Sequence, residues 1–178
     1  DQMVPEGISI SVGPPGKDES DLLLDGDVDA LFHAAEPKAF VEGNPKVKRL
    51  FTDPRAAERD YYRRTGIFPI MHAVAIRNDL IDAHPWLPEA VFNAYSQAKQ
   101  QRYEAMRREW LLGTLPWYGQ ELDETRALMG ENFWPYGIAE NAQTLNALFQ
   151  YSYEQGLARS RLTVEQLFHP STLQLADI

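Results

Sequence analysis

The chain has 178 residues, of which 44% are hydrophobic and 11% aromatic, which is enough for one domain or two small lobes with an apolar core. A formal net charge of −9 argues against a nucleic-acid partner, because phosphate binding needs a basic surface. No window approaches twenty apolar residues, so no membrane insertion is expected. The absence of cysteine excludes disulfides, thiolate metal sites and cysteine nucleophiles.

The first third of the chain is expected to alternate strands with short helices. A short helix around residues 22–24 is expected to end at Gly26, and another to begin at Pro37, since proline is tolerated at the first helical position. The opening "DQMVPEGISISV" resembles neither an initiator Met region nor a signal peptide, so we interpret the sequence as a fragment or a processed chain. The predicted strands span residues 8–12, 28–32 and, more weakly, 47–51.

The middle of the chain holds the most strand-like run. A helix over residues 53–64 is broken by Gly66, and residues 67–76 are then apolar on both faces, as in a covered central strand. A turn of helix over "NDLIDAHP" and a long helix over residues 86–112 follow. Helices are expected from there to the end of the chain, the last one beginning at the capping-box pair Thr163 and Gln166.

Strands and helices thus alternate early and helices dominate late, which predicts an α/β class. The predicted strands are too few for a self-sufficient parallel sheet. This again suggests that part of the fold is missing.

Three stretches carry a resemblance to a known family. "DGDVDALFHAAEPKAF" resembles a segment of type II periplasmic-binding-protein folds that delivers the chain into the cleft between two lobes. "AAERDYYRRTGIFPIMHAVAIRNDLIDAHPWLPEAVFNAYSQAK" and the tail containing "FWPYG" resemble the 4,5-dihydroxyphthalate decarboxylase family, which uses that two-lobed fold. The resemblance covers nearly the whole chain and is loose only in the first twenty residues.

The resemblance implies a C-terminal fragment rich in helices. Residues 1–66 would be part of the second lobe, and residues 67–178 the crossover strand and the C-terminal helices returning to the first lobe. The missing N-terminal half of the same protein would then be the chain's partner, and assembly into a homo-oligomer stays open.

The function implied by the resemblance is cofactor-free decarboxylation of a small aromatic dicarboxylate that bears two hydroxyls. An alternative on the same fold is a solute-binding protein of an ABC-type uptake system for small organic anions, and a third is a catalytically silent relative. An enzyme would be cytoplasmic and a solute-binding protein periplasmic. A signal peptide or lipid-attachment cysteine in the absent half would favour the second.

Substrate-binding residues are expected at the entrance of the crossover strand. Two substrate carboxylates call for cations, and arginine offers a planar fork with two parallel donors. We favour Arg64 over the adjacent Arg63, because neighbours on a helix diverge by about 100° and Arg64 is nearer the hinge. Tyr62, Thr65 and Lys38 are further candidates. The alternative interpretation of these charges is an ordinary solvated surface.

Proton transfer is assigned to histidine, which titrates near neutral pH. His72 lies within the apolar run and His33 at the end of a predicted strand, where open α/β sheets bind ligands. The alternatives are a core residue for His72 and a backbone-bonded loop residue for His33. His84 and His169, each before a proline, are interpreted as structural.

No metal or other cofactor is expected. The sequence contains neither His-x-His nor His-Glu-x-x-His and no cysteine. Spacing alone leaves open a metal held by His33 and His72 with a carboxylate. The aromatic "FWPYG" (residues 133–137) either walls the cleft or packs one helix on another.

Overall fold

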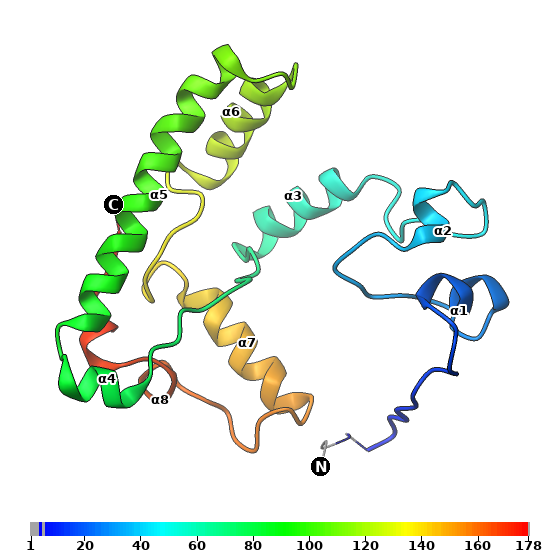
Figure 1. The fold of residues 1–178 in the computed structure, drawn as a ribbon, viewed down its shortest axis with the longest axis horizontal. Helices are drawn as coiled ribbons and strands as arrows, with labels where there is room; N and C mark the ends of the chain where they lie inside the picture. Colours follow the sequence, from blue (N-terminus) through cyan, green and yellow to red (C-terminus); the bar gives the residue numbers. More distant parts are fainter. Residues whose placement is uncertain (1–3, 5, 178) are drawn as a thin grey trace. The chain divides into compact units, whose positions relative to one another are not determined.

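The structure is a computed structural model that describes residue 4 and residues 6–177, with the backbone alone at 110–112. The chain divides into two compact units, residues 1–58 and 59–178, which are considered separately below. Figure 1 shows that the described chain consists of helices joined by long coil segments.

The first unit contains two short helices, α1 (Glu19–Asp25) and α2 (Lys38–Val41). The predicted end of the first helix is confirmed, because Gly26 caps α1 in the left-handed conformation with φ 78°. The two helices are joined at a buried point, where the Ala39 amide donates a 3.0 Å hydrogen bond to the Ser20 hydroxyl.

Helix α3 (Pro54–Thr65) crosses from the first unit into the second and has no buried residue. The predicted break is confirmed: Gly66 follows with φ 61°, which an L side chain rarely adopts. Within the second unit, Arg59 of α3 forms ion pairs with Glu124 (2.5 Å) and Glu121 (3.1 Å) of α6.

The second unit is built around the long helix α5 (Leu87–Leu112), whose prediction is confirmed. Its buried apolar residues include Ile81 of α4, Leu122 of α6, and Leu145 and Phe149 of α7. Helix α4 and the terminal 3₁₀ helix both contact α5. The other elements are α4 (Asn78–Ala83), α6 (Tyr118–Met129), α7 (Ala142–Glu154), α8 (Val164–Leu167) and η1 (Pro170–Thr172).

The C-terminal segment returns to α5 and to the loop that follows α6. Gly137 and Ala176 form an isolated antiparallel bridge, and Lys99 of α5 forms a buried ion pair with Asp177. The predicted capping box is confirmed at α8, where Thr163 and Gln166 exchange side-chain contacts with each other's backbone.

The predicted strands are absent from the described residues. Residues 8–12, 28–32 and 47–51 and the apolar run 67–76 are coil, and no backbone hydrogen bond joins residues 68–76 to any described residue. A strand exists only when a neighbouring strand accepts and donates its ladder hydrogen bonds. Residues 67–76 therefore have the apolar pattern of a strand, but no described segment pairs with them.

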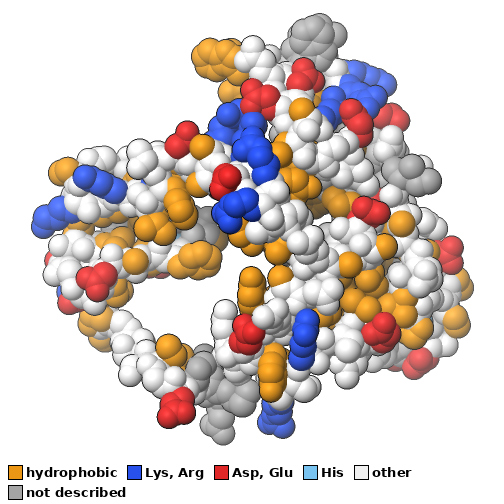
Figure 2. Space-filling view, turned by 180° about the vertical axis from the view of Figure 1, so that it is seen from behind, with side chains coloured by type: hydrophobic (Ala, Val, Ile, Leu, Met, Phe, Trp, Pro, Cys, Tyr) orange, Lys and Arg blue, Asp and Glu red, His pale blue; other side chains and the backbone are white. Residues whose placement is uncertain are grey.

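The apolar run lies largely at the surface. Phe68, Ile70, Met71 and Val74 are all exposed. Figure 2 shows apolar side chains at the surface of one face of the molecule. The α/β class, the two-lobed fold and the lobe boundary at residue 66 stay predictions, since they depend on a sheet that the described residues do not form. Among the described residues, no helix is both long and apolar enough to span a bilayer.

Candidate functional site

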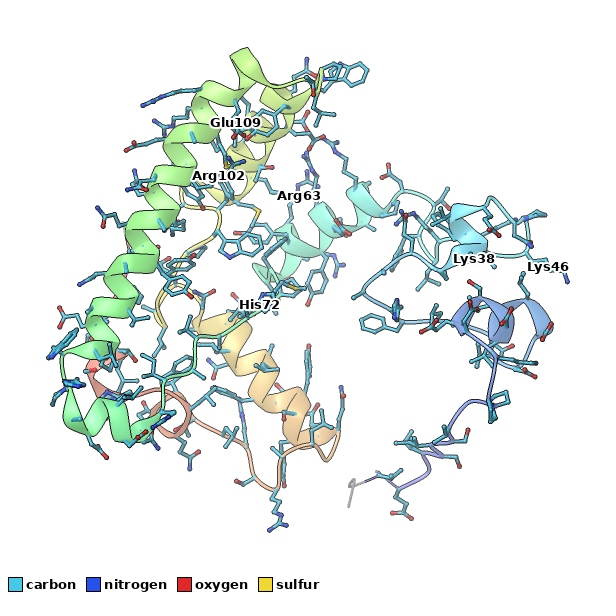
Figure 3. All side chains as sticks on the ribbon, viewed as in Figure 1. Lys38, Lys46, Arg63, His72, Arg102 and Glu109 are labelled. Carbon is cyan, nitrogen blue, oxygen red and sulfur yellow. The ribbon has the colours of Figure 1, made fainter. Side chains whose placement is uncertain are left out.

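The C-terminal turn of α3 presents the two predicted arginines. Arg64 Nε donates a 2.9 Å hydrogen bond to Asp60 one helical turn earlier, and its side chain is 63% exposed. Arg63 is exposed and has no ion-pair partner among the described residues (Figure 3). An exposed pair at i,i+4 holds its arginine weakly, so Arg64 remains available to an anion.

Thr65, the last residue of α3, uses its hydroxyl locally. The hydroxyl donates to the Tyr61 carbonyl (2.8 Å) and accepts from the Ile67 amide (3.1 Å). The Thr65 carbonyl accepts from Gln143 of α7. Thr65 therefore shapes the turn out of α3, and it retains one free lone pair for a ligand. Tyr62, on the same turn, is partly buried.

His72 lies in the coil that joins α3 to α4 (Figure 3). Its side chain is exposed and makes no hydrogen bond or ion pair with a described residue. The interpretation of His72 as a core residue is wrong for the described structure, because the strand that would have buried it is absent.

His33 and Lys38 lie in the first unit. His33 Nδ1 is 3.0 Å from the Ala35 carbonyl oxygen and 3.1 Å from the Ala35 amide, and Nε2 is 3.7 Å from Glu19. His33 is thus turned onto its own loop, as its structural interpretation expected. Lys38 forms a long, exposed ion pair of 3.9 Å with Glu42. The predicted site residues are therefore divided between the two units.

His84 and His169 behave as predicted for structural residues. His84 ends α4 and packs at 5.8 Å, ring centre to ring centre, from Trp86. His169 caps η1 by accepting from the Ser171 amide. Among the described residues, no group of three His, Asp or Glu side chains is arranged to hold a metal ion.

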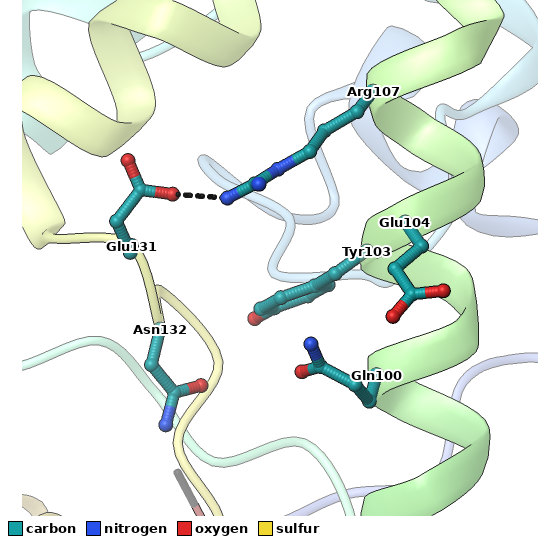
Figure 4. A pocket seen from close by; sticks show the side chains of 6 residues that line it. All are labelled: Gln100, Tyr103, Glu104, Arg107, Glu131 and Asn132. Carbon is teal, nitrogen blue, oxygen red and sulfur yellow. Dashed lines mark hydrogen bonds and ion pairs between the residues drawn. The ribbon is translucent and has the colours of Figure 1, made fainter.

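Sequence reasoning missed a polar pocket that lies wholly within the second unit. It has a volume of about 250 Å³ and lies between α5 and the loop that follows α6 (Figure 4). The signal that would have located it is a run of polar side chains at helical spacing on α5, opposite the "FWPYG" loop. Its lining residues are Gln100, Tyr103, Glu104, Arg107, Glu131 and Asn132.

Next to this pocket, the ammonium of Lys99 organises the loop. It donates to Asn132 Oδ1 (2.8 Å) and to the Trp134 carbonyl (2.9 Å), and it pairs with Asp177. These three partners match the three donors of a lysine ammonium. The ammonium also lies 4.5 Å from the centre of the Tyr136 ring, a favourable cation–π position. Lys99 is therefore fully satisfied as a structural group.

Two phenols next to this lysine are held in their neutral form. Burial raises the pKa of both Tyr103 and Tyr136, with the Asp177 carboxylate adding to the effect. The Tyr103 oxygen accepts a 2.9 Å hydrogen bond from the Trp134 amide, and its ring stacks on Phe133 at 4.6 Å. "FWPYG" thus packs against α5, while its two predicted roles stay predictions, and Tyr103 retains its proton as a donor.

A second and larger pocket, of about 460 Å³, lies between α7 and the segment around α8. Its apolar lining includes Ile138, Leu162 and Val164, and Arg161 is its one cation among the described lining residues.

No protein-family model matches the chain. The chain is 38% identical over 172 residues to 4,5-dihydroxyphthalate decarboxylase of Comamonas testosteroni, an alignment that covers 96% of the chain and 52% of the relative. It is also 33% identical over 60 residues to 4,5-dihydroxyphthalate decarboxylase of Pseudomonas putida, covering 34% of the chain and 23% of the relative.

The predicted resemblance is therefore confirmed: the chain is a homologue of the 4,5-dihydroxyphthalate decarboxylases, which are carboxy-lyases. The chain spans about half the length of the Comamonas relative.

Proposed function

We propose that the protein decarboxylates a hydroxylated aromatic dicarboxylate of the 4,5-dihydroxyphthalate type to a monocarboxylate, without a cofactor. The observation that carries the proposal is the 38% identity to the Comamonas decarboxylase over 96% of this chain. The names of both relatives favour this activity over the solute-binding alternative.

The chemistry required is modest. The bond between the ring carbon and the leaving carboxylate breaks, CO₂ departs, and its electron pair stays on the ring carbon, which then takes a proton. A hydroxyl para to that carbon supplies electron density, so no electron-sink cofactor is needed. The protein has to hold the second carboxylate and to deliver one proton.

Within the second unit, Arg64 and His72 are the residues that we assign to these two tasks. Among the described residues, the Arg64 guanidinium pairs with the exposed Asp60 alone, so a substrate carboxylate competes for it at little cost. His72 has both ring nitrogens unengaged by described residues, and an imidazole can serve as a general acid or base. Arg63, Tyr62 and Thr65 on the same turn are the supporting contacts, and His33 and Lys38 are the candidates in the first unit.

We propose in addition that residues 67–76 become a strand of the two-lobed fold when they pair with polypeptide that the relatives contain and this chain does not span. The exposed apolar side chains of this run and its unpaired backbone support this. The chain alone is then expected to be inactive.

The test is incubation with 4,5-dihydroxyphthalate, following CO₂ and the monocarboxylate product. It uses this chain alone and this chain joined to the portion of the Comamonas relative outside the matched region, with the complete relative as positive control. We expect turnover from the joined protein. A joined protein that unfolds cooperatively yet releases no CO₂, while the relative does, would contradict the proposed function.

A further inference from the structure

Two guanidinium groups from different helices converge on one carboxylate oxygen beside the polar pocket. Arg107 of α5 donates a 3.0 Å hydrogen bond from Nη2 to Glu131 Oε2. Arg126 of α6 places Nε 3.3 Å from the same oxygen. The carboxylate belongs to the loop that follows α6, and Figure 4 shows it facing Arg107 across the pocket.

One of the two cations, Arg126, is largely buried, whereas Arg107 and the carboxylate of Glu131 are exposed. The Arg126 side chain is only 17% exposed, while that of Glu131 is 69% exposed. Arg126 Nε is buried and makes no hydrogen bond with a described residue, so its contact with Glu131 is an ion pair only. A buried donor without a full partner is the exception in folded proteins and calls for an explanation.

The loop geometry allows Glu131 to leave. Its neighbour Gly130 has φ 88°, and a side chain at Gly130 would meet no atom within 4 Å, so the space beside this residue is open. Glu131 Oε1 has no partner among the described residues. Among the described residues, the carboxylate is thus held in place by the two arginines alone.

We propose that the pocket lined by Tyr103, Arg107 and Glu131 binds a small aromatic acid, whose carboxylate replaces that of Glu131 between Arg107 and Arg126. The choice of an aromatic acid rests on the proposed function. Glu131 then acts as an internal competitor that occupies the carboxylate position when no ligand is bound.

The other lining residues suit a single hydroxylated ring. The volume of about 250 Å³ lies just below the range of about 300–1,000 Å³ that is typical of drug-sized ligands. Tyr103 has its oxygen engaged by the Trp134 amide but its proton free to donate to the ligand. Glu104 faces the pocket and can accept from a ligand hydroxyl, as can the amides of Gln100 and Asn132 (Figure 4).

The test measures binding of phthalate by isothermal titration calorimetry to the 178-residue chain, without turnover. In E131Q the competing charge is removed while the side-chain shape is kept. If Glu131 occupies the site nine-tenths of the time, E131Q tightens phthalate binding about tenfold. Adding R107A to E131Q should abolish this gain. Arg107 is exposed and Arg126 is not, so R107A is the variant with the smaller risk to folding.

Two control variants isolate the site. E109Q removes a carboxylate from a second arginine pair on α5, that of Arg102, which does not line the pocket. R161A removes the cation of the larger pocket. Both should bind phthalate as the unmodified chain does. Helix content by circular dichroism and the thermal midpoint are measured for each variant. If E131Q/R107A is unfolded, E131Q/R107K takes its place in the binding measurement.

Three results would overturn the inference: no phthalate binding to E131Q, equal affinities of E131Q and the unmodified chain, or loss of binding in R161A. The last would place the acid in the other pocket. Turnover of 4,5-dihydroxyphthalate with unchanged phthalate affinity in E131Q would contradict this subsite and leave the proposed function standing. Tighter phthalate binding in E131Q, without turnover by the joined protein, would support this subsite and contradict the proposed function.

Discussion

Lys99 in α5 and Asp177 at the end of the chain form an ion pair whose side chains are only 7% and 4% exposed. Asp177 also accepts hydrogen bonds from the Tyr136 amide (2.9 Å) and the Asn132 side chain (3.2 Å). One buried pair therefore joins the long helix, the loop after α6 and the C-terminal segment. The loop walls the polar pocket, so the pair holds that pocket in shape.

Removing one partner of this pair should destabilise the second unit strongly, because it leaves the other charge buried alone. For K99M or D177A we expect a loss of about 3–5 kcal/mol in the free energy of unfolding, or no cooperative transition at all. Urea unfolding followed by circular dichroism measures this. R77A, which removes the exposed Arg77–Asp79 pair, is the control and should leave the urea midpoint unchanged. Equal midpoints for D177A and R77A would show that the pair contributes nothing.

Gly137 and Gly130 provide a matched pair of glycine substitutions. Both have positive φ, 104° and 88°, so alanine is strained at either position. At Gly137, however, the new Cβ would overlap the Leu175 carbonyl and approach Ala176 Cα to 3.2 Å, whereas at Gly130 it would meet nothing. G130A should cost about 1–2 kcal/mol in unfolding free energy, and G137A clearly more.

Amide hydrogen exchange tests the glycine prediction at individual residues. G137A should also weaken protection of the C-terminal amides, because the bridge to Ala176 is broken. Indistinguishable unfolding curves for the two variants would argue that the C-terminal segment is not docked on this loop in solution.

Because Arg102 and Glu109 form an exposed ion pair on α5, we expect the stability of the folded chain to depend on pH. The Arg102 guanidinium hydrogen-bonds the Glu109 carboxylate and lowers its pKa below the usual 4.5. A carboxylate with a lowered pKa in the folded state contributes stability above its unfolded pKa, which is lost as pH falls through the folded pKa. NMR titration of the Glu109 carboxyl carbon should give a midpoint below 4.5, and R102Q should bring it back toward 4.5. A midpoint that R102Q leaves in place would refute the assignment.

The two roles assigned within the second unit predict different kinetics in the joined protein. R64A should mainly raise KM, because a carboxylate that is held from the start contributes ground-state binding. R63A is the adjacent control and should change KM less. H72Q should lower kcat by about 10²–10⁴-fold and flatten one limb of the pH profile.

Because His72 is exposed, the effect of H72Q on kcat can be separated from an effect on stability. Because its side chain is exposed and makes no hydrogen bond or ion pair with a described residue, H72Q should leave the thermal midpoint of the 178-residue chain unchanged. An unchanged kcat for H72Q in the joined protein would remove His72 from the mechanism and make His33 the next residue to test.

Decarboxylation is expected to survive exhaustive chelation. The sequence contains no local metal motif, and the described residues form no cluster of three ligating side chains. Turnover is measured before and after dialysis against EDTA. Loss of turnover that a single added divalent ion restores would disprove the prediction.

The helices and their ends could be predicted because their causes are local. The apolar periodicity of α5, the break at Gly66 and the capping box of Thr163 and Gln166 each depend on residues within a few positions of one another. The pairing of Arg64 with Asp60 is of the same kind, since residues four apart are neighbours on a helix. The resemblance to the decarboxylases was likewise carried by short continuous stretches.

The sequence by itself thus determined the helices, their caps and the family to which the chain is similar. Only the tertiary structure decided that residues 67–76 lie as exposed coil, because a strand needs a ladder partner from elsewhere in the fold. The tertiary structure also brought Arg107 and Arg126 to Glu131, and Lys99 to Asp177. The residues of each group lie on different segments, and contacts between segments depend on packing, which local pattern does not encode.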